Sequence, residues 1–112
     1  MKISEIAVSL SARTLSASSD SREIGTAYAG DMLSDVLALG RGPDLLLTGL
    51  LNPQVIRTAE MLDISCVIFV RGKEPDGEIL SLAEKCGVAV LSTDMDMYEA
   101  CGILCAASVL PA

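Results

Sequence analysis

The chain has 112 residues, of which half are apolar and only three are aromatic, and it carries a net charge of −7 with a pI near 4.3. This length predicts a single domain, residues 1–112, with an adequate but modest core. The acidic charge, the lack of a basic run and the scarcity of aromatic residues argue against binding to nucleic acid or to an anionic membrane surface.

Histidine does not occur in the sequence, which excludes Ser-His-Asp and Cys-His catalysis and removes the commonest general base and metal ligand. No stretch approaches the roughly 18 consecutive apolar residues of a membrane span. The N-terminal segment lacks the long apolar run and cleavage motif of a signal peptide. We therefore expect a cytoplasmic protein.

The N-terminal segment predicts a short amphipathic helix over residues 3–10, capped by Ser4, and then a strand over residues 12–17. The serine-rich segment 18–23 predicts a solvated turn, with phosphorylation as the less favoured alternative. Residues 23–29 alternate and predict a second strand. Its two faces carry Ile24, Thr26 and Tyr28 on one side and Gly25, Ala27 and Ala29 on the other. The small face predicts close packing by a helix.

The segment YAGDMLSDVL places two aspartates four residues apart, just after a glycine that ends the second strand. Asp31 is in position to cap a helix that runs to about residue 39, and Asp35 falls in its first turn. The expected apolar stripe of this helix consists of Leu33, Val36 and Leu37. A metal or acid/base pair is the alternative, but no histidine or further acidic residue lies nearby in the sequence, so we favour the helix start.

The second half alternates strands and helices joined by short links. Strands are predicted at 44–49, 65–70 and 88–91, and helices at 53–63, 75–87 and 95–107. Asn52 before Pro53 is a helix start, and Gly87 is a helix end. All-apolar strands alternating with helices indicate an α/β fold. We expect a single three-layer domain with a mainly parallel sheet, β-α-β-α-β-α in its second half, after a helix-strand-strand-helix lead-in.

The carboxyl ends of parallel strands meet at one edge of a sheet, where ligands bind in open α/β folds. Helix N-termini and an arginine at this edge favour a small anion, such as a nucleotide or a phosphorylated metabolite. The other interpretation is that these residues are turn glycines, helix caps and a surface arginine. The candidate ligand-binding residues are Thr48, Gly49, Asn52, Arg71, Gly72, Thr93 and Asp94. No phosphate-loop motif is present, which argues against phosphoryl transfer.

The four cysteines have no CxxC spacing. Cys101 and Cys105 are four residues apart on the last helix, which would provide half of a zinc or iron–sulfur site. Cys66 and Cys86 lie on other elements, so buried apolar cysteines are the favoured interpretation. We therefore expect neither a metal nor a cofactor.

The last helix is apolar on all sides, since Glu99 is the only charged residue between Met97 and Leu110. The sheet can cover one side of such a helix, and a second copy of the chain would cover the other. The alternative is that the N-terminal layer covers it. The candidate homodimer interface consists of Tyr98, Cys101, Ile103, Leu104, Cys105, Val109 and Leu110.

Three stretches together resemble the DRTGG domain family in order and spacing. They are YAGDMLSDVL (28–37), DLLLTGLLNPQVIRTAEMLDISCVIFVRG (44–72) and GVAVLSTDMDMYEACGIL (87–104). The name-giving motif differs here, with Leu51-Asn52-Pro53 in place of an aspartate-arginine pair and Val70-Arg71-Gly72 in place of Thr-Gly-Gly.

The resemblance implies a non-catalytic module of the kind found in some phosphotransacetylases, between paired CBS domains in certain pyrophosphatases, and as small free-standing proteins. It also implies a fold similar to the N-terminal domain of HPr kinase/phosphorylase, without the catalytic phosphate-loop domain of that enzyme. We therefore expect a regulatory or interaction module that forms a homodimer and is not an enzyme. A sensor of a small anionic ligand is the alternative, and a protein partner in a larger regulatory or metabolic complex is a further possibility.

Overall fold

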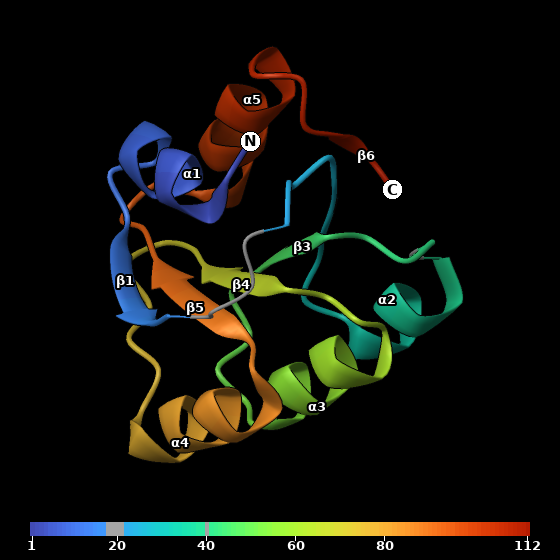
Figure 1. Ribbon diagram of the computed structural model, residues 1–112, viewed down its shortest axis with the longest axis vertical. Helices are drawn as coiled ribbons and strands as arrows, with labels where there is room; N and C mark the ends of the chain where they lie inside the picture. Colours follow the sequence, from blue (N-terminus) through green and yellow to red (C-terminus); the bar gives the residue numbers. More distant parts are fainter. Residues whose placement is uncertain (18–21, 40) are drawn as a thin grey trace.

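The computed structural model describes residues 1–17, 22–39 and 41–112. Within these residues, helices cover both faces of one six-stranded sheet with strand order β1-β5-β4-β3-β2-β6, as Figure 1 shows. The strands are β1 (Arg13–Ser16), β2 (Thr26–Ala29), β3 (Leu45–Thr48), β4 (Cys66–Phe69), β5 (Ala89–Ser92) and β6 (Leu110–Pro111). The helices are α1 (Ile3–Ser9), α2 (Leu33–Leu39), α3 (Gln54–Met61), α4 (Gly77–Cys86) and α5 (Met97–Ala106). The predicted three-layer α/β fold is confirmed.

The sheet is parallel except at β1. Strands β2, β3, β4 and β5 run in one direction, β6 pairs parallel to β2, and β1 pairs antiparallel to β5. The carboxyl ends of β2 to β5 therefore share one edge of the sheet, which we call the carboxyl edge. Arg13 begins the antiparallel strand β1 and pairs with Ser92, so it lies at the same edge.

Two hydrophobic clusters fill the space on either side of the sheet. Helices α1 and α5 pack on one face, while α2, α3 and α4 pack on the other (Figure 1). Alternate residues of β3 point into different clusters, because Leu45 and Leu47 join the α1/α5 side and Leu46 joins the α2/α3/α4 side. This two-sided burial explains why the central strands are apolar at nearly every position.

The N-terminal segment departs from the predicted pattern at two points. Helix α1 begins at Ile3, and Glu5 Oε1 accepts a hydrogen bond from the backbone of Lys2 at 2.8 Å, so Ser4 is not its cap. Ile24 and Tyr28 were expected on one face, but they belong to opposite clusters. The strand begins only at Thr26, and the Ile24 N–H instead donates to the carbonyl of residue 1 at 2.6 Å. The serine-rich segment 18–23, for which a solvated turn is predicted, falls largely on residues 18–21, outside the described residues.

The other helix ends follow the predicted signals with small differences. Helix α3 begins at Gln54, whose N–H donates to Asn52 Oδ1 at 2.8 Å, so Asn52 caps this turn as predicted. Gly87 adopts the left-handed conformation with φ of 71° and ends α4. Leu37 of α2 is 45% exposed, so the apolar stripe of that helix is narrower than predicted. No helix in the described part of the chain is long and apolar enough to cross a membrane.

Strand β6 is not among the predicted elements. Helix α5 ends at Ala106, Ser108 adopts a left-handed conformation with φ of 70°, and the chain then turns back beside β2. The strand has two residues and one of them is proline, so it carries no period of two that a sequence could reveal. Proline is tolerated there because β6 is an edge strand.

Replacement by alanine should change the free energy of unfolding in opposite directions at two glycines, one at the end of α4 and one inside α5. Gly87→Ala places a Cβ at a positive φ and should lower the free energy of unfolding by about 1 kcal/mol. Gly102→Ala lies inside α5, where a Cβ meets nothing within 4 Å, and should raise it by about 0.5–1 kcal/mol. Urea denaturation measures both. A neutral Gly87→Ala would contradict the assigned role of Gly87 at the end of α4.

Candidate functional site

Asp31 is the central side chain of the carboxyl edge. Its Oδ1 atom accepts a hydrogen bond from the Gly49 N–H at 2.7 Å and one from the Thr48 hydroxyl at 3.2 Å. Its Oδ2 atom lies 3.8 Å from Nη2 of Arg71. Asp31 therefore joins the ends of β2, β3 and β4.

The prediction that Asp31 caps α2 is wrong. The carbonyl of Met32 accepts a hydrogen bond from Val36, so the helix begins after Met32 and Asp31 lies one residue too early to cap it. The Gly30 N–H donates to the Leu47 carbonyl at 3.0 Å, which extends the pairing of β2 with β3 and brings Asp31 to the end of β3.

The surroundings of Asp31 favour its charged form. The hydrogen bond from the Gly49 N–H lowers the pKa of the Asp31 carboxyl, and partial burial opposes this effect. The Thr48 hydroxyl and the positive charges of Arg71 and Lys73 lower the pKa further. These groups favour the ionised carboxylate of Asp31, which a backbone N–H, a hydroxyl and two positively charged side chains stabilise.

Arg71 is held at the edge by its backbone. It adopts a left-handed conformation with φ of 60°, which is uncommon for a residue other than glycine. Its N–H donates to the Met95 carbonyl at 2.8 Å, and the next N–H, of Gly72, donates to the Thr93 carbonyl at 2.9 Å. These bonds fasten the end of β4 to the loop that follows β5.

The guanidinium of Arg71 lies against the backbone of Gly49. A Cβ at position 49 would collide with Nη2 of Arg71, so any other residue at this position would displace the end of the arginine side chain. The ion pair with Asp31 is its one charged contact, and the guanidinium makes no hydrogen bond with any residue that the structure describes. It is 45% exposed, so its N–H groups remain accessible from solvent.

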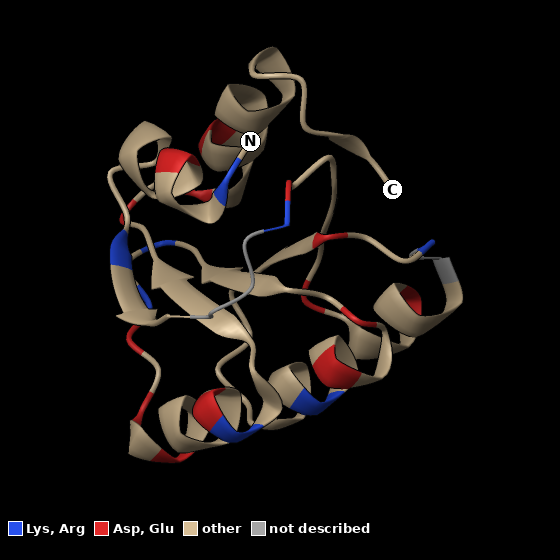
Figure 2. Ribbon diagram, in the orientation of Figure 1, with Lys and Arg blue, Asp and Glu red and all other residues tan. Residues whose placement is uncertain are grey.

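A second group of charges lies beside the first, at the end of β5. Arg13 forms ion pairs with Glu74 and with Asp94, the latter at 3.5 Å, and donates to the Ser92 hydroxyl at 3.2 Å. The positive charge of Arg13 is therefore balanced within the chain. In Figure 2, α3 and α4 carry both acidic and basic residues, whereas α1, α2 and α5 carry acidic residues alone.

The structure places the seven predicted ligand-binding residues in different roles. Thr48, Gly49 and Arg71 meet around Asp31. Gly72 lies next to Asp94, which pairs with Arg13. The Thr93 hydroxyl is buried and donates to a carbonyl of the α1 end at 2.7 Å, and the Asn52 side chain is occupied by its helix cap.

An apolar groove of about 460 Å³ lies between α5 and the part of the sheet formed by β3, β2 and β6. Its walls come from β2, β3, α5 and the residues around β6, namely Ala27, Tyr28, Ala29, Leu47, Cys101, Leu104, Cys105, Val109, Leu110, Pro111 and Ala112. Ala27 and Ala29 were expected to allow close packing by a helix, but they form part of the groove instead.

The predicted interface residues fall into three sets. Leu104 and Val109 are buried inside the chain, in the same hydrophobic cluster as Ile6 of α1, so the N-terminal layer covers part of α5. Cys101 and Ile103 are half-buried, while the remaining three residues are exposed. These three are Tyr98, Cys105 and Leu110.

The sequence model of the DRTGG domain family matches residues 5–107. The chain belongs to this family. Its structure is similar to the crystal structure of the CBS and DRTGG domains of the regulatory region of Clostridium perfringens pyrophosphatase, complexed with the activator diadenosine tetraphosphate. The TM-score is 0.77 at 21% sequence identity, a likeness in fold that covers 92% of this chain and 45% of that one. A comparison with curated proteins found no match.

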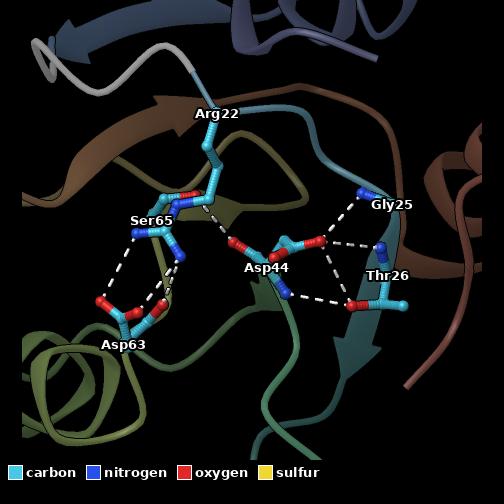
Figure 3. Close-up of polar contacts among 6 residues, drawn as sticks. All are labelled: Arg22, Gly25, Thr26, Asp44, Asp63 and Ser65. Carbon is cyan, nitrogen blue, oxygen red and sulfur yellow. Dashed lines mark hydrogen bonds and ion pairs between the residues drawn. The ribbon is translucent and has the colours of Figure 1, made fainter.

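The opposite edge of this DRTGG domain carries a second polar network, which Figure 3 shows. Asp44 Oδ2 accepts hydrogen bonds from the N–H groups of Gly25 and Thr26 at 2.9 and 3.2 Å. Arg22 Nη1 donates to the Asp63 carbonyl at 3.1 Å and lies 3.4 Å from its carboxylate. This network joins the amino ends of β2 and β3 to the end of α3 and has a structural role.

The thiols of the DRTGG domain are poor candidates for chemistry. Burial raises the pKa of Cys66 to about 12 and also raises the pKa values of Cys86 and Cys101. Thiolates are the reactive form of cysteine, so these groups are weak nucleophiles at neutral pH. Among the described residues, no three His, Cys, Asp or Glu side chains converge on one point.

Sequence reasoning missed Asp31, Lys73 and Arg13 at the carboxyl edge. Asp31 could have been found, because it follows β2 just as Gly49 follows β3, and the rule that carboxyl ends meet applies to both. Arg13 had no such signal, since it begins a strand whose antiparallel pairing is set only by the tertiary fold.

Asp31→Asn tests the electrostatic role of this carboxylate. Because the pKa of Asp31 is lowered by folding, its contribution to stability is present above the ordinary aspartate value of about 3.9 and is lost as the pH falls through the folded value. The variant should be less stable than the wild type by about 0.5–1 kcal/mol at pH 7, and the difference should shrink below about pH 4.

Urea denaturation across this pH range measures the difference. Asp35→Asn is the matched control, because the exposed Asp35 side chain makes no hydrogen bond or ion pair with the described residues. Equal pH profiles for the wild type and the Asp31 variant would contradict the assigned role.

Proposed function

We propose that this chain is a non-catalytic regulatory domain that self-associates as a homodimer through α5 and the residues around β6. Membership of the DRTGG family and the likeness in fold to part of a regulatory region support the regulatory role. The outer surface of α5, with Glu99 as the one charged residue of the helix, lies beside an open apolar groove, and this observation carries the homodimer.

The outer side of α5 is unlike that of the other long helices. Its exposed residues are Tyr98, Glu99, Gly102, Cys105 and Ala106. Tyr98 is 91% exposed, and Leu110 next to the groove is 56% exposed. The surfaces of α3 and α4 carry both acidic and basic residues, whereas α5 shows a single acidic band (Figure 2). An apolar surface of this kind is typical of association sites, and two-fold homodimers are the commonest assembly.

The same proposal extends to the setting in which the domain works. The four cysteines are unpaired, which supports a reducing cytoplasmic compartment. The similar structure is part of the regulatory region of an enzyme, which supports a protein partner in a larger regulatory complex.

Introduction of a negative charge on α5 or on β6 tests the homodimer. Tyr98→Glu and Leu110→Glu introduce an acidic side chain at exposed positions and should leave the fold intact. In a two-fold interface each change places like charges near one another, so the dimer dissociation constant should rise at least tenfold, about 1.4 kcal/mol. Sedimentation equilibrium measures it.

Met61→Glu is the matched control, since Met61 is 71% exposed on α3, on the other face of the sheet. It should leave the dissociation constant unchanged. A wild-type chain that sediments as a monomer throughout the micromolar range would overturn the homodimer.

A second candidate function is supported by the carboxyl edge. Here the domain would sense a small anionic ligand, a nucleotide or a phosphorylated metabolite. The supporting observation is the Arg71 guanidinium, which lies beside the Gly49 N–H and the Thr48 hydroxyl with no hydrogen-bond acceptor among the described residues. Arginine with backbone N–H groups is a common phosphate-binding combination.

Ligand-dependent thermal stabilisation tests this candidate with a panel of nucleotides, dinucleoside polyphosphates and acyl phosphates. A binder at 100 times its Kd should stabilise the wild type by about 2.7 kcal/mol. Arg71→Asn should abolish the effect, because asparagine tolerates the left-handed backbone but lacks the guanidinium. Arg57→Asn, at an exposed position on α3, should retain it. The absence of stabilisation across the panel would count against the sensor.

A further inference from the structure

We propose that the ends of β3 and β4 form an oxyanion site and that the Asp31 carboxylate is its built-in occupant. A phosphate or carboxylate group of a ligand then binds by displacing Asp31. This inference rests on the second candidate function, since it specifies how a ligand would occupy the carboxyl edge and what it must displace.

The donors come from two neighbouring strands. Strand β3 ends in the Thr48 hydroxyl and the Gly49 N–H, and β4 is followed by the Arg71 guanidinium, which lies against Gly49. A hydroxyl, a backbone N–H and a guanidinium that converge on one point are the donor types that bind oxyanions in proteins. Asp31 reaches this point from a third strand, β2.

Asp31 satisfies these donors only in part. Its carboxylate accepts from Gly49 at 2.7 Å and from Thr48 at 3.2 Å, but its distance to the guanidinium is 3.8 Å, which exceeds a hydrogen bond. Asp31 is covalently tethered to the end of β2, and its Oδ1 atom is already bound to β3. A free phosphate has three or more acceptor oxygens and no tether, so it can satisfy all the donors at once.

The charges that act on Asp31 also favour an added anion. Arg71 and Lys73 both lower the pKa of Asp31, so one carboxylate is opposed by two positive charges. The neighbouring Arg13 adds no positive charge to this site, because it pairs with two acidic residues, Glu74 and Asp94. The side chains of Asp31 and Arg71 are about half exposed, at 52% and 45%. Displacement therefore returns the Asp31 carboxylate to water rather than burying it.

Displacement of Asp31 would be transmitted to α2. Asp31 lies between Gly30, which pairs with β3, and Met32, whose carbonyl begins the helix. Release of the carboxylate frees Asp31 and Met32, the two residues that link Gly30 to the first residue of α2. Helix α2 carries the exposed apolar residue Leu37, and Met32 before it is 61% exposed, so the link leads to a surface that another molecule can contact.

The test compares the binding of inorganic phosphate and of acetate to the wild type, Asp31→Ala and Asp31→Ala with Arg71→Asn, at constant ionic strength. Thermal unfolding and the NMR chemical shift of the Gly49 N–H are the two measurements. Asp31→Ala should bind phosphate at least tenfold more tightly than the wild type, with a shift of the Gly49 resonance, and the double variant should lose this binding. Acetate, with two oxygens, should bind more weakly than phosphate.

Asp35→Ala is the matched control and should bind phosphate like the wild type. If Asp31→Ala does not fold, Asp31→Asn keeps the shape of the side chain without its charge and should show the same order of affinities with a smaller factor.

The failures of the two proposals have different signatures. Equal phosphate affinity for the wild type and Asp31→Ala, with loss in the double variant, would overturn the role of Asp31 and leave the ligand site in place. A folded Asp31→Ala that binds neither phosphate nor acetate at Gly49 would overturn the oxyanion site itself.

Discussion

The burial of a parallel sheet on both faces is the constraint on which the rest of this structure depends. Three consecutive leucines of β3 point alternately into two separate clusters, and the neighbouring β4 and β5 are buried along their whole length. These three strands run parallel and are joined by crossover helices, which brings their carboxyl ends to one edge. The hydroxyl side chains of β3, β4 and β5 are Thr48 and Ser92, each the last residue of its strand, so polar contacts are confined to the two edges of the sheet and to the outer surfaces of the helices.

An aspartate joins neighbouring strands at each edge of the sheet, but in the described part of the chain the polar groups around it are fully paired at only one edge. At each edge an aspartate accepts hydrogen bonds from donors of a neighbouring strand, Asp44 at the amino ends and Asp31 at the carboxyl ends. The Asp44 network is satisfied, since its carbonyl also accepts from the N–H and the hydroxyl of Ser65 (Figure 3). The carboxyl edge leaves the Arg71 guanidinium without a hydrogen bond in the described residues. This contrast separates an edge whose polar groups are paired from one with a guanidinium that lacks such a hydrogen bond, which is the basis of the proposed ligand site.

The sequence predicted the layers and most elements because apolar runs, glycines and prolines act locally. Gly87 and Asn52 are examples, since each ends or begins a helix through its own conformation or side chain. The role of Asp31 was missed because its partners are 17 and 18 residues away and meet it only through the pairing of β2 with β3. A local rule for helix caps gave a competing and simpler answer. The inward position of Leu104 also depends on a tertiary contact, the packing of α1 on α5.

The two candidate functions share the same strand ends. Ala29 and Leu47 line the groove beside α5. Asp31 follows Ala29 by two residues, and Thr48 is the residue after Leu47. A ligand that displaces Asp31 would therefore alter the β2–β3 pairing that also shapes the groove. If the groove belongs to the homodimer interface, binding and association are linked, and by thermodynamic reciprocity the ligand must then bind the dimer and the monomer with different affinities. A regulatory domain without its own chemistry can act in this way, by converting occupancy of one sheet edge into a change in association at the neighbouring surface.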